Sequence, residues 1–181
     1  MGRWYCTREQ VKRALGEQAP SGERDKILDQ KIEAASREIE GITHRQYIPE
    51  TAAELYPWPQ RNGAGSALYL KRDLLAVTAL TKDGVDIVAI AATDYFLEPS
   101  IDGPPYHRIE IDLASSAFFS ARDTHQRAIT VTGRWGYSED TETAGALAEA
   151  DDGAETALNV TDSSLIGVGD TILIGSEAMF V

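Results

Sequence analysis

The sequence predicts an α+β fold in which an N-terminal helical pair packs on an antiparallel β-meander, followed by a small acidic β-rich C-terminal segment. Apolar residues at steps of three and four indicate a long amphipathic helix over Asp25–Gly41. From Ile42 onward, β-branched and aromatic residues interrupted by turn signals indicate strands. The charge balance then changes, because no Lys or Arg follows Arg134 while ten of the 29 acidic residues do.

This change in charge predicts three parts. Residues 1–137 are expected to form one core domain, and residues 138–156, rich in Ala, Gly and acids, an acidic linker. Residues 157–181 regain strand character as a β-rich segment. Its final apolar run stops at Phe180–Val181, which predicts either a strand that pairs within an assembly or a chain that continues further.

The two helices have recognisable ends. Thr7-Arg8-Glu9-Gln10 has the pattern of a capping box, so a short helix is predicted to begin near Arg8 and to end at Gly16. The long helix is expected to have Ser21 as its cap and to end at Gly41, a residue suited to left-handed dihedrals. Its buried stripe is predicted to be Leu28, Ile32, Ala35 and Ile39.

The middle of the chain reads as a series of antiparallel strands. The clearest signal is Asp83-Gly84, which favours a two-residue hairpin turn between flanking β-rich runs. The expected strands are Glu54–Pro59, Ala67–Leu70, Ala76–Thr81, Val85–Ile90, Asp94–Pro99, Arg108–Ile111 and Ala128–Tyr137.

Composition excludes several classes of protein. The net charge of −12 argues against the basic surface of the usual nucleic-acid-binding protein. No apolar run approaches the roughly 20 residues of a membrane span, and the N-terminus lacks the apolar core of a secretory signal. We therefore expect an intracellular protein without a membrane partner. The single cysteine, Cys6, cannot form an intramolecular disulfide.

No catalytic constellation stands out, so the chain is predicted to be neither an enzyme nor a binder of a metal or cofactor. On a strand, His107 and Glu110 point to opposite faces and cannot share a metal ion. Tyr56 and Trp58 precede a glycine-rich loop that contains Arg61. This loop supports an alternative hypothesis, a small non-catalytic β-domain that binds a ligand or carbohydrate there.

Several runs, taken in order, resemble the head–tail connector (adaptor) proteins of tailed bacteriophages. The opening Tyr5-Cys6-Thr7-Arg8-Glu9-Gln10-Val11-Lys12 is similar to the start of that family. The helix Ile32–Glu40 with Thr43-His44-Arg45-Gln46-Tyr47 also follows the family pattern, as do Asp94–Leu97 and Ile129–Tyr137. The resemblance covers about residues 4–137. After Gly136-Tyr137 the family has a proline and a further helix, whereas this chain has its acidic segment.

The resemblance implies a structural protein of the virion neck, assembled in the host bacterial cytoplasm. Such an adaptor forms a homo-oligomeric ring, typically of twelve copies, below the portal protein. It carries a downstream connector, stopper or tail-completion protein, and double-stranded DNA passes through it without being gripped. An acidic channel wall would repel phosphates and keep the duplex mobile. We expect Tyr56, Trp58, Arg61 and Arg37 at subunit or partner contacts, and Glu33, Glu38 and Glu40 facing the channel.

Overall fold

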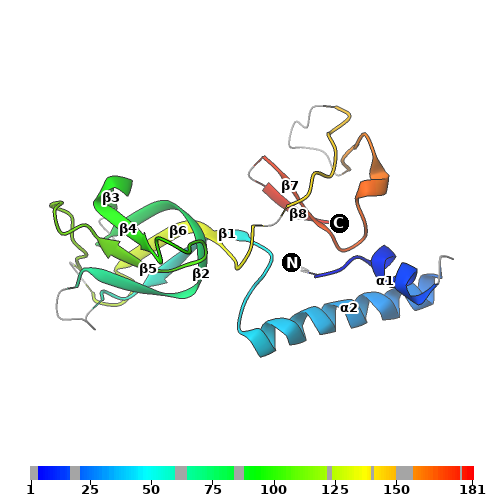
Figure 1. Cartoon of the computed structure of the whole chain (residues 1–181), viewed down its shortest axis with the longest axis horizontal. Coiled ribbons are helices and arrows are strands. Elements are labelled where there is room, and N and C mark those ends of the chain that lie inside the picture. Colours follow the sequence, from blue (N-terminus) through cyan, green and yellow to red (C-terminus); the bar gives the residue numbers. More distant parts are fainter. Residues whose placement is uncertain are drawn as a thin grey trace. The chain divides into compact units, whose positions relative to one another are not determined.

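The computed structural model describes residues 4–16, 21–59, 65–83, 88–121, 124–139, 141–149, 157–175 and 177–181, which form two α-helices and two antiparallel β-sheets (Figure 1). The α+β class predicted from the sequence is confirmed. The chain folds as two units. Unit 1 combines Met1–His44 with Asp140–Val181, and unit 2 is the continuous stretch Arg45–Glu139.

Unit 1 differs from the predicted division, in which the C-terminal segment follows a complete core domain. The backbone N–H of Arg8 donates to the carbonyl of Val168 (3.0 Å), and the Val168 N–H donates to a carboxylate oxygen of Glu9 (2.9 Å). The ring of Trp4 packs edge-on against Phe180, with centroids 5.5 Å apart. The C-terminal segment therefore completes the unit that contains the N-terminal helices.

Two glycines permit this close packing. A Cβ atom on Gly167 would lie 2.9 Å from Cβ of Thr7, closer than unstrained atoms approach. Gly169 has a φ of +106° and would place a Cβ 2.3 Å from the ring of Trp4. The loop that contains Gly167 and Gly169 can lie against residues 4–7, the N-terminal arm, only because neither glycine carries a side chain.

The C-terminal segment ends in a two-stranded antiparallel sheet, β7 (Thr171–Ile174) with β8 (Glu177–Phe180). A 3-10 turn, η2 (Ser163–Leu165), precedes it and is capped by the side chain of Asp162. An isolated antiparallel bridge pairs Leu147 of the predicted acidic linker with Val160 of the predicted β-rich segment. Part of this linker therefore has strand-like pairing, and residues 150–156 lie outside the described part of the chain.

Helix α1 (Arg8–Leu15) begins and ends as predicted. The Thr7 side chain accepts from the Gln10 backbone N–H, while the Gln10 side chain accepts from the Thr7 N–H (2.9 Å), which completes the capping box. Gly16 adopts the left-handed conformation at φ 73°, and its N–H donates back to the last turn.

Helix α2 (Gly22–Thr43) is longer at both ends than the predicted Asp25–Gly41. The prediction that Gly41 ends the helix is wrong, because the residue in the left-handed conformation is His44 (φ 54°). A glycine inside a helix costs only about 1 kcal/mol relative to alanine, so the helix can continue through it. Ser21 occupies the N-cap position, but its side chain makes no capping hydrogen bond.

The buried face of α2 is rotated from the predicted stripe. Ile32 is buried as expected, but the next buried residue is Ser36, and Ile39 remains 43% exposed. Hydrogen bonds explain why Ser36 faces inward. Its hydroxyl accepts from the backbone N–H of Tyr5 (3.2 Å) and donates to the Ile32 carbonyl (2.8 Å). Contact with the N-terminal arm, which the helical period alone does not reveal, selects the inward face.

Two ion pairs join α1 to the N-terminal half of α2, which lie side by side in Figure 1. The Arg8 guanidinium makes two bonds to the Asp29 carboxylate, at 2.7 and 2.5 Å. The Lys12 ammonium lies 2.6 Å from an oxygen of Asp25, and both side chains are only 15% exposed. The Lys12 ammonium thereby holds the pKa of Asp25 below its ordinary value.

Asp25→Asn is expected to lower the thermal midpoint of unit 1 at pH 7, because the neutral side chain loses the ion pair with Lys12. The folded-state pKa of Asp25 is depressed, so its stabilisation is present above the unfolded value of about 3.9 and is lost as the pH falls through the folded value. Thermal melts should therefore separate the variant from the parent at pH 7 and converge in strong acid. Glu23→Gln, with the same charge change in the same helical turn, is the control. A difference that persists below the folded pKa would contradict the assignment.

Unit 2 is built on one six-stranded antiparallel sheet. Its strand order is β1-β6-β2-β5-β4, with β3 paired to β2. The last strand, β6, lies between β1 and β2, so the order differs from the sequential order of a meander. The strands are β1 (Glu50–Tyr56), β2 (Ala67–Lys82), β3 (Val88–Ile90), β4 (Tyr95–Glu98), β5 (Tyr106–Ile111) and β6 (Ile129–Trp135).

Strand β2 joins two strands that were predicted separately. It pairs with β5 at Ala67–Tyr69 and at Leu74, and with β6 from Leu74 to Thr81, with register shifts that include the stretch between Tyr69 and Leu74. Such irregularities bend a strand and allow it to take part in both sides of a curved sheet. Gly133 on β6 makes the close approach possible, since a Cβ there would lie 2.2 Å from the Ala76 carbonyl oxygen.

The predicted hairpin exists, but its turn is longer than two residues. Lys82 pairs with Val88, which leaves five residues between the paired positions. Asp83, predicted as part of the turn, is instead buried (6% exposed) and bonds to the hydroxyl of Ser120. Residues 84–87, including Gly84, lie outside the described residues.

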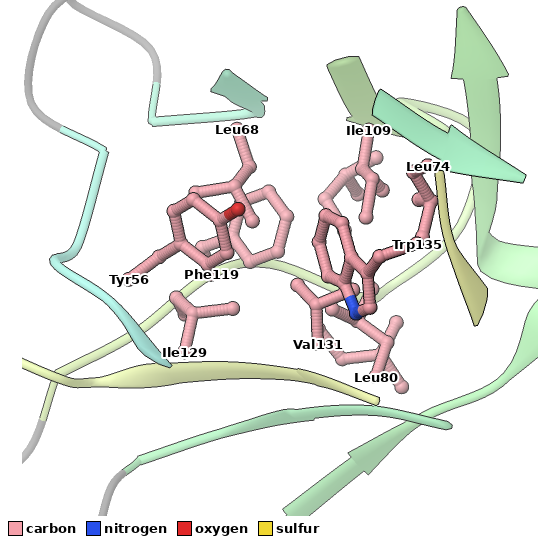
Figure 2. Packing of buried hydrophobic residues seen from close by; sticks show 11 residues of the cluster. Tyr56, Leu68, Leu74, Leu80, Ile109, Phe119, Ile129, Val131 and Trp135 are labelled. Atoms are coloured by element: carbon pink, nitrogen blue, oxygen red, sulfur yellow. The ribbon is translucent and has the colours of Figure 1, made fainter. Parts of the chain in front are cut away.

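The core of unit 2 lies inside this curved sheet (Figure 2). Trp135 is fully buried and its indole N–H donates to the Ala52 carbonyl (3.0 Å). Figure 2 shows the Trp135 indole between Ile109, Leu74 and Val131. Side chains from five strands and one loop make up the cluster: Tyr56, Leu68, Leu74, Leu80, Ile90, Ile109, Ile111, Phe119, Ile129, Val131 and Trp135.

Candidate functional site

Among the residues that the structure describes, no three or more His, Cys, Asp or Glu side chains are grouped so as to hold a metal ion. The part of the chain that the structure describes also contains no helix long and apolar enough to span a membrane. Cys6 is a free, partly buried thiol.

Tyr56, a predicted contact residue, lies in the core of unit 2 with 2% of its surface exposed. Its hydroxyl donates to a carboxylate oxygen of Glu54 (2.8 Å) and accepts from the Lys71 backbone N–H (3.3 Å). Burial raises the pKa of Tyr56 above its usual value. Because the ring packs against the core in Figure 2, it presents no face to a partner.

Trp58 is also held by its own unit. Its indole N–H donates to the Phe119 carbonyl (3.0 Å), and its backbone N–H donates to the His125 carbonyl (2.8 Å). The Trp58 ring packs against the hydrophobic core and lies 5.7 Å from the His125 ring. Arg61 lies outside the described residues. Neither described aromatic is thus arranged as an open platform for a sugar or another ligand.

Arg37 lies in unit 1, apart in the chain from the other predicted contact residues. Its guanidinium is 2.5 Å from one carboxylate oxygen of Glu40, and the other oxygen of Glu40 accepts from the Tyr5 hydroxyl (2.6 Å). Glu40 therefore ties the N-terminal arm to α2. Because both oxygens of the Glu40 carboxylate are engaged within unit 1, this side chain is less available to face a channel.

The three predicted channel acids do not share one face of α2. Glu33 and Glu40 are seven residues apart and so lie on the same side, whereas Glu38 is rotated from Glu33 by about 140° at 3.6 residues per turn. Glu33 and Glu38 are both exposed. One straight helix can direct only one of these two acids toward a given lumen.

Arg72 organises a polar cluster of unit 2 that sequence patterns did not indicate. Its guanidinium bonds to Glu54 (2.8 Å), Glu50 (2.6 Å) and the side-chain oxygen of Gln46 (2.6 Å), and it lies 6.0 Å from the Trp135 ring centroid. The only local indication of this cluster in the sequence is that Glu50 and Glu54, four residues apart, lie on the same face of one strand. With all these contacts made within the unit, the cluster holds the sheet together at this end.

Two loop tips of unit 2 expose large apolar side chains that the sequence patterns did not single out. Ile101 is 93% exposed in the β4–β5 turn, and Leu113 is 85% exposed just after β5. Gly103 packs tightly in the first loop, where a Cβ would lie 2.2 Å from the Tyr106 ring. In the second, the Ala114 N–H donates to the Asp112 carboxylate (2.8 Å). These two tips are the most exposed large apolar residues described.

Protein-family models and curated proteins match this chain nowhere. Among the large apolar side chains of the described residues, those of Ile101 and Leu113 are the most exposed, which makes them candidates for contacts with other proteins.

Proposed function

We propose that this chain is a non-enzymatic adaptor of a tailed-phage neck. It forms a ring below the portal protein, joins the DNA-filled head to the next connector, stopper or tail-completion protein, and lets double-stranded DNA pass. The ring resides in the virion after assembly in the host bacterial cytoplasm, and the copy number expected from the resemblance is twelve. The proposal rests on the ordered sequence resemblance and on one structural observation.

That observation is the placement of two apolar tips beyond opposite ends of β5. Ile101 lies in the turn before Tyr106, where the strand begins, and Leu113 follows Ile111, where it ends. A six-residue strand spans about 20 Å at 3.3 Å per residue, so the tips are well separated. An adaptor between two different components needs separate contact points of this kind, whereas a single binding site needs only one.

The charge of the chain is consistent with the passage of DNA. The net charge of −12 disfavours tight binding of phosphates, so a ring of such chains would present few attractive contacts to a moving duplex. If α2 lines the channel, the geometry of the helix allows either Glu33 or Glu38 to face it, but not both. Glu40 is engaged by Tyr5 and Arg37 and is a weaker candidate.

Ile101→Ser and Leu113→Ser are each expected to weaken binding to one of the two neighbouring neck components by about tenfold while sparing the other. Burying one such side chain in an interface contributes roughly 1.5 kcal/mol or more, which corresponds to this factor. Pull-down and light scattering with the purified portal and downstream connector measure both contacts, and negative-stain images report the ring.

Leu55→Ser is the matched control, because Leu55 is 50% exposed on an edge strand and not on either tip. The adaptor function is contradicted if the parent chain remains a monomer with the portal present. The role of the tips is contradicted if rings form and both serine variants bind both components as the parent does.

A further inference from the structure

One long face of α2 remains uncovered in unit 1. The face follows steps of three and four residues and occupies about a third of the helix circumference at 3.6 residues per turn. It lies apart from the buried residues Ile32 and Ser36. We call the part of this face from Ile27 to Ile42 the outer stripe, and its six members, all exposed, are Ile27, Lys31, Ala34, Ala35, Glu38 and Ile42.

The outer stripe carries apolar groups at both ends. Ile27 is 53% exposed and Ile42 is 73% exposed, although burial of either side chain in an apolar contact would be favourable. Scattered single apolar residues are normal at a surface, but here they belong to one helical face with two alanines at its middle. Such a face suits a second helix.

The charged members of the outer stripe have opposite signs. Lys31 and Glu38 are two helical turns apart, too far to pair with each other along the helix. Among the described residues, no ion pair is found for either of them. Their charges remain available to a partner that presents the complementary order.

The outer stripe is complementary to a second copy of itself that runs antiparallel to it. Its residues are arranged symmetrically about the midpoint between Ala34 and Ala35. Turning a second α2 antiparallel about that midpoint brings each Ile27 opposite Ile42, and each Lys31 opposite Glu38. A two-fold, isologous contact requires a surface with this property.

We propose that two copies of this chain associate through antiparallel pairing of their α2 outer stripes. The small side chains of Ala34 and Ala35 allow the helix axes to approach to about 8 Å at the crossing point. Two Ile27–Ile42 contacts close the ends, about 22 Å apart along the helix at 1.5 Å per residue. Two Lys31–Glu38 pairs fix the antiparallel register.

The pairing goes beyond the proposed function and does not depend on it. An isologous contact joins two copies and then stops, so it cannot by itself close a ring of many copies. The dimer is therefore a state of the free chain that is not part of a neck, in which the outer stripe would otherwise face water. A single pair of helices of this length buries less than the standard interface of about 1,600 Å², so the dimer should dissociate in roughly the micromolar range.

The test exchanges the two charges. In Lys31→Glu, two pairs of acidic side chains replace the two attractive pairs. In Glu38→Lys, two pairs of basic side chains replace them. Each single variant should therefore dimerise about tenfold more weakly than the parent. The double variant Lys31→Glu/Glu38→Lys restores both pairs in reverse and should return to the parent dissociation constant. An equimolar mixture of the two single variants should form heterodimers, because every pair across that interface is again attractive.

Sedimentation velocity over a range of concentrations, at low salt, measures the parent, the three variants and the mixture. Glu33→Lys makes the same charge change as Glu38→Lys on another face of α2 and should leave the dissociation constant unchanged. A parent chain that stays monomeric at high concentration overturns the pairing, as does a double variant or mixture that fails to recover. Rings seen with the portal in either case would leave the adaptor function standing.

Discussion

Trp135→Ala is expected to lower the free energy of unfolding of unit 2 by about 3–5 kcal/mol. The indole is fully buried at the end of β6 and is one of the largest side chains in the core. Its removal leaves a cavity that the surrounding strands cannot fill, because β6 is fixed between β1 and β2. It also leaves the carbonyl of the partly buried Ala52 without its indole donor.

Trp135→Phe separates the two contributions. Phenylalanine retains much of the apolar volume but not the N–H donor, so its cost should be a fraction of that of alanine. Urea denaturation followed by far-ultraviolet circular dichroism gives both values, since fluorescence would report the loss of the tryptophan itself. Tyr137→Ala, at a 36% exposed position two residues later, is the control. A cost below about 1 kcal/mol for Trp135→Ala would contradict the burial of the indole.

Gly169→Ala is the second substitution with a large expected effect, about 2–4 kcal/mol in unit 1. The backbone has a φ of +106°, which disfavours any side chain, and the new Cβ would lie 2.3 Å from the Trp4 ring. The same residue donates its N–H to the Val181 carbonyl (3.0 Å). Hydrogen exchange should show lost protection in α1 as well as in β8, because Trp4 and Phe180 lose their mutual contact.

Gly175→Ala isolates the contact from the backbone effect. Gly175 also has a positive φ (59°), but a Cβ there would meet nothing within 4 Å. Its substitution should cost about 1–2 kcal/mol and leave the protection of α1 unchanged. If Gly169→Ala disturbed β7 and β8 alone, the C-terminal segment would not be an integral part of unit 1.

Local signals in the sequence were sufficient for the elements that depend on neighbouring residues. The capping box at Thr7 and the stop at Gly16 both predict α1 correctly, because each involves atoms within one helical turn. The strands Asp94–Pro99 and Arg108–Ile111 correspond to β4 and β5 for the same reason, as alternation reflects one buried face.

Long-range pairing could not be predicted in this way. Nothing near Ile129 indicates that β6 lies between β1 and β2, and nothing near Val168 indicates that its backbone bonds to Arg8. The glycines that permit these contacts, Gly133 and Gly169, lie in runs for which the sequence predicts only strand character. Their meaning depends on a partner that is distant along the chain.

The candidate contact residues show the same limit. Aromatic residues near a loop suggested that Tyr56 and Trp58 were available to a partner, but a strand pattern does not say which residues the core will use. Conversely, Ile101 and Leu113 stand in turn-like sequence, and only the folded chain shows how far they are exposed. Composition indicates that apolar groups exist, and the fold decides which of them remain at the surface.

The way the two chain ends meet in unit 1 has a consequence for synthesis on the ribosome. Unit 2 is continuous, so Arg45–Glu139 can fold as soon as this stretch has emerged. The helices α1 and α2 are made first, yet their unit lacks Val168, Gly169 and Phe180 until the segment near residue 181 has been translated. The oldest part of the nascent chain is therefore the last to be completed.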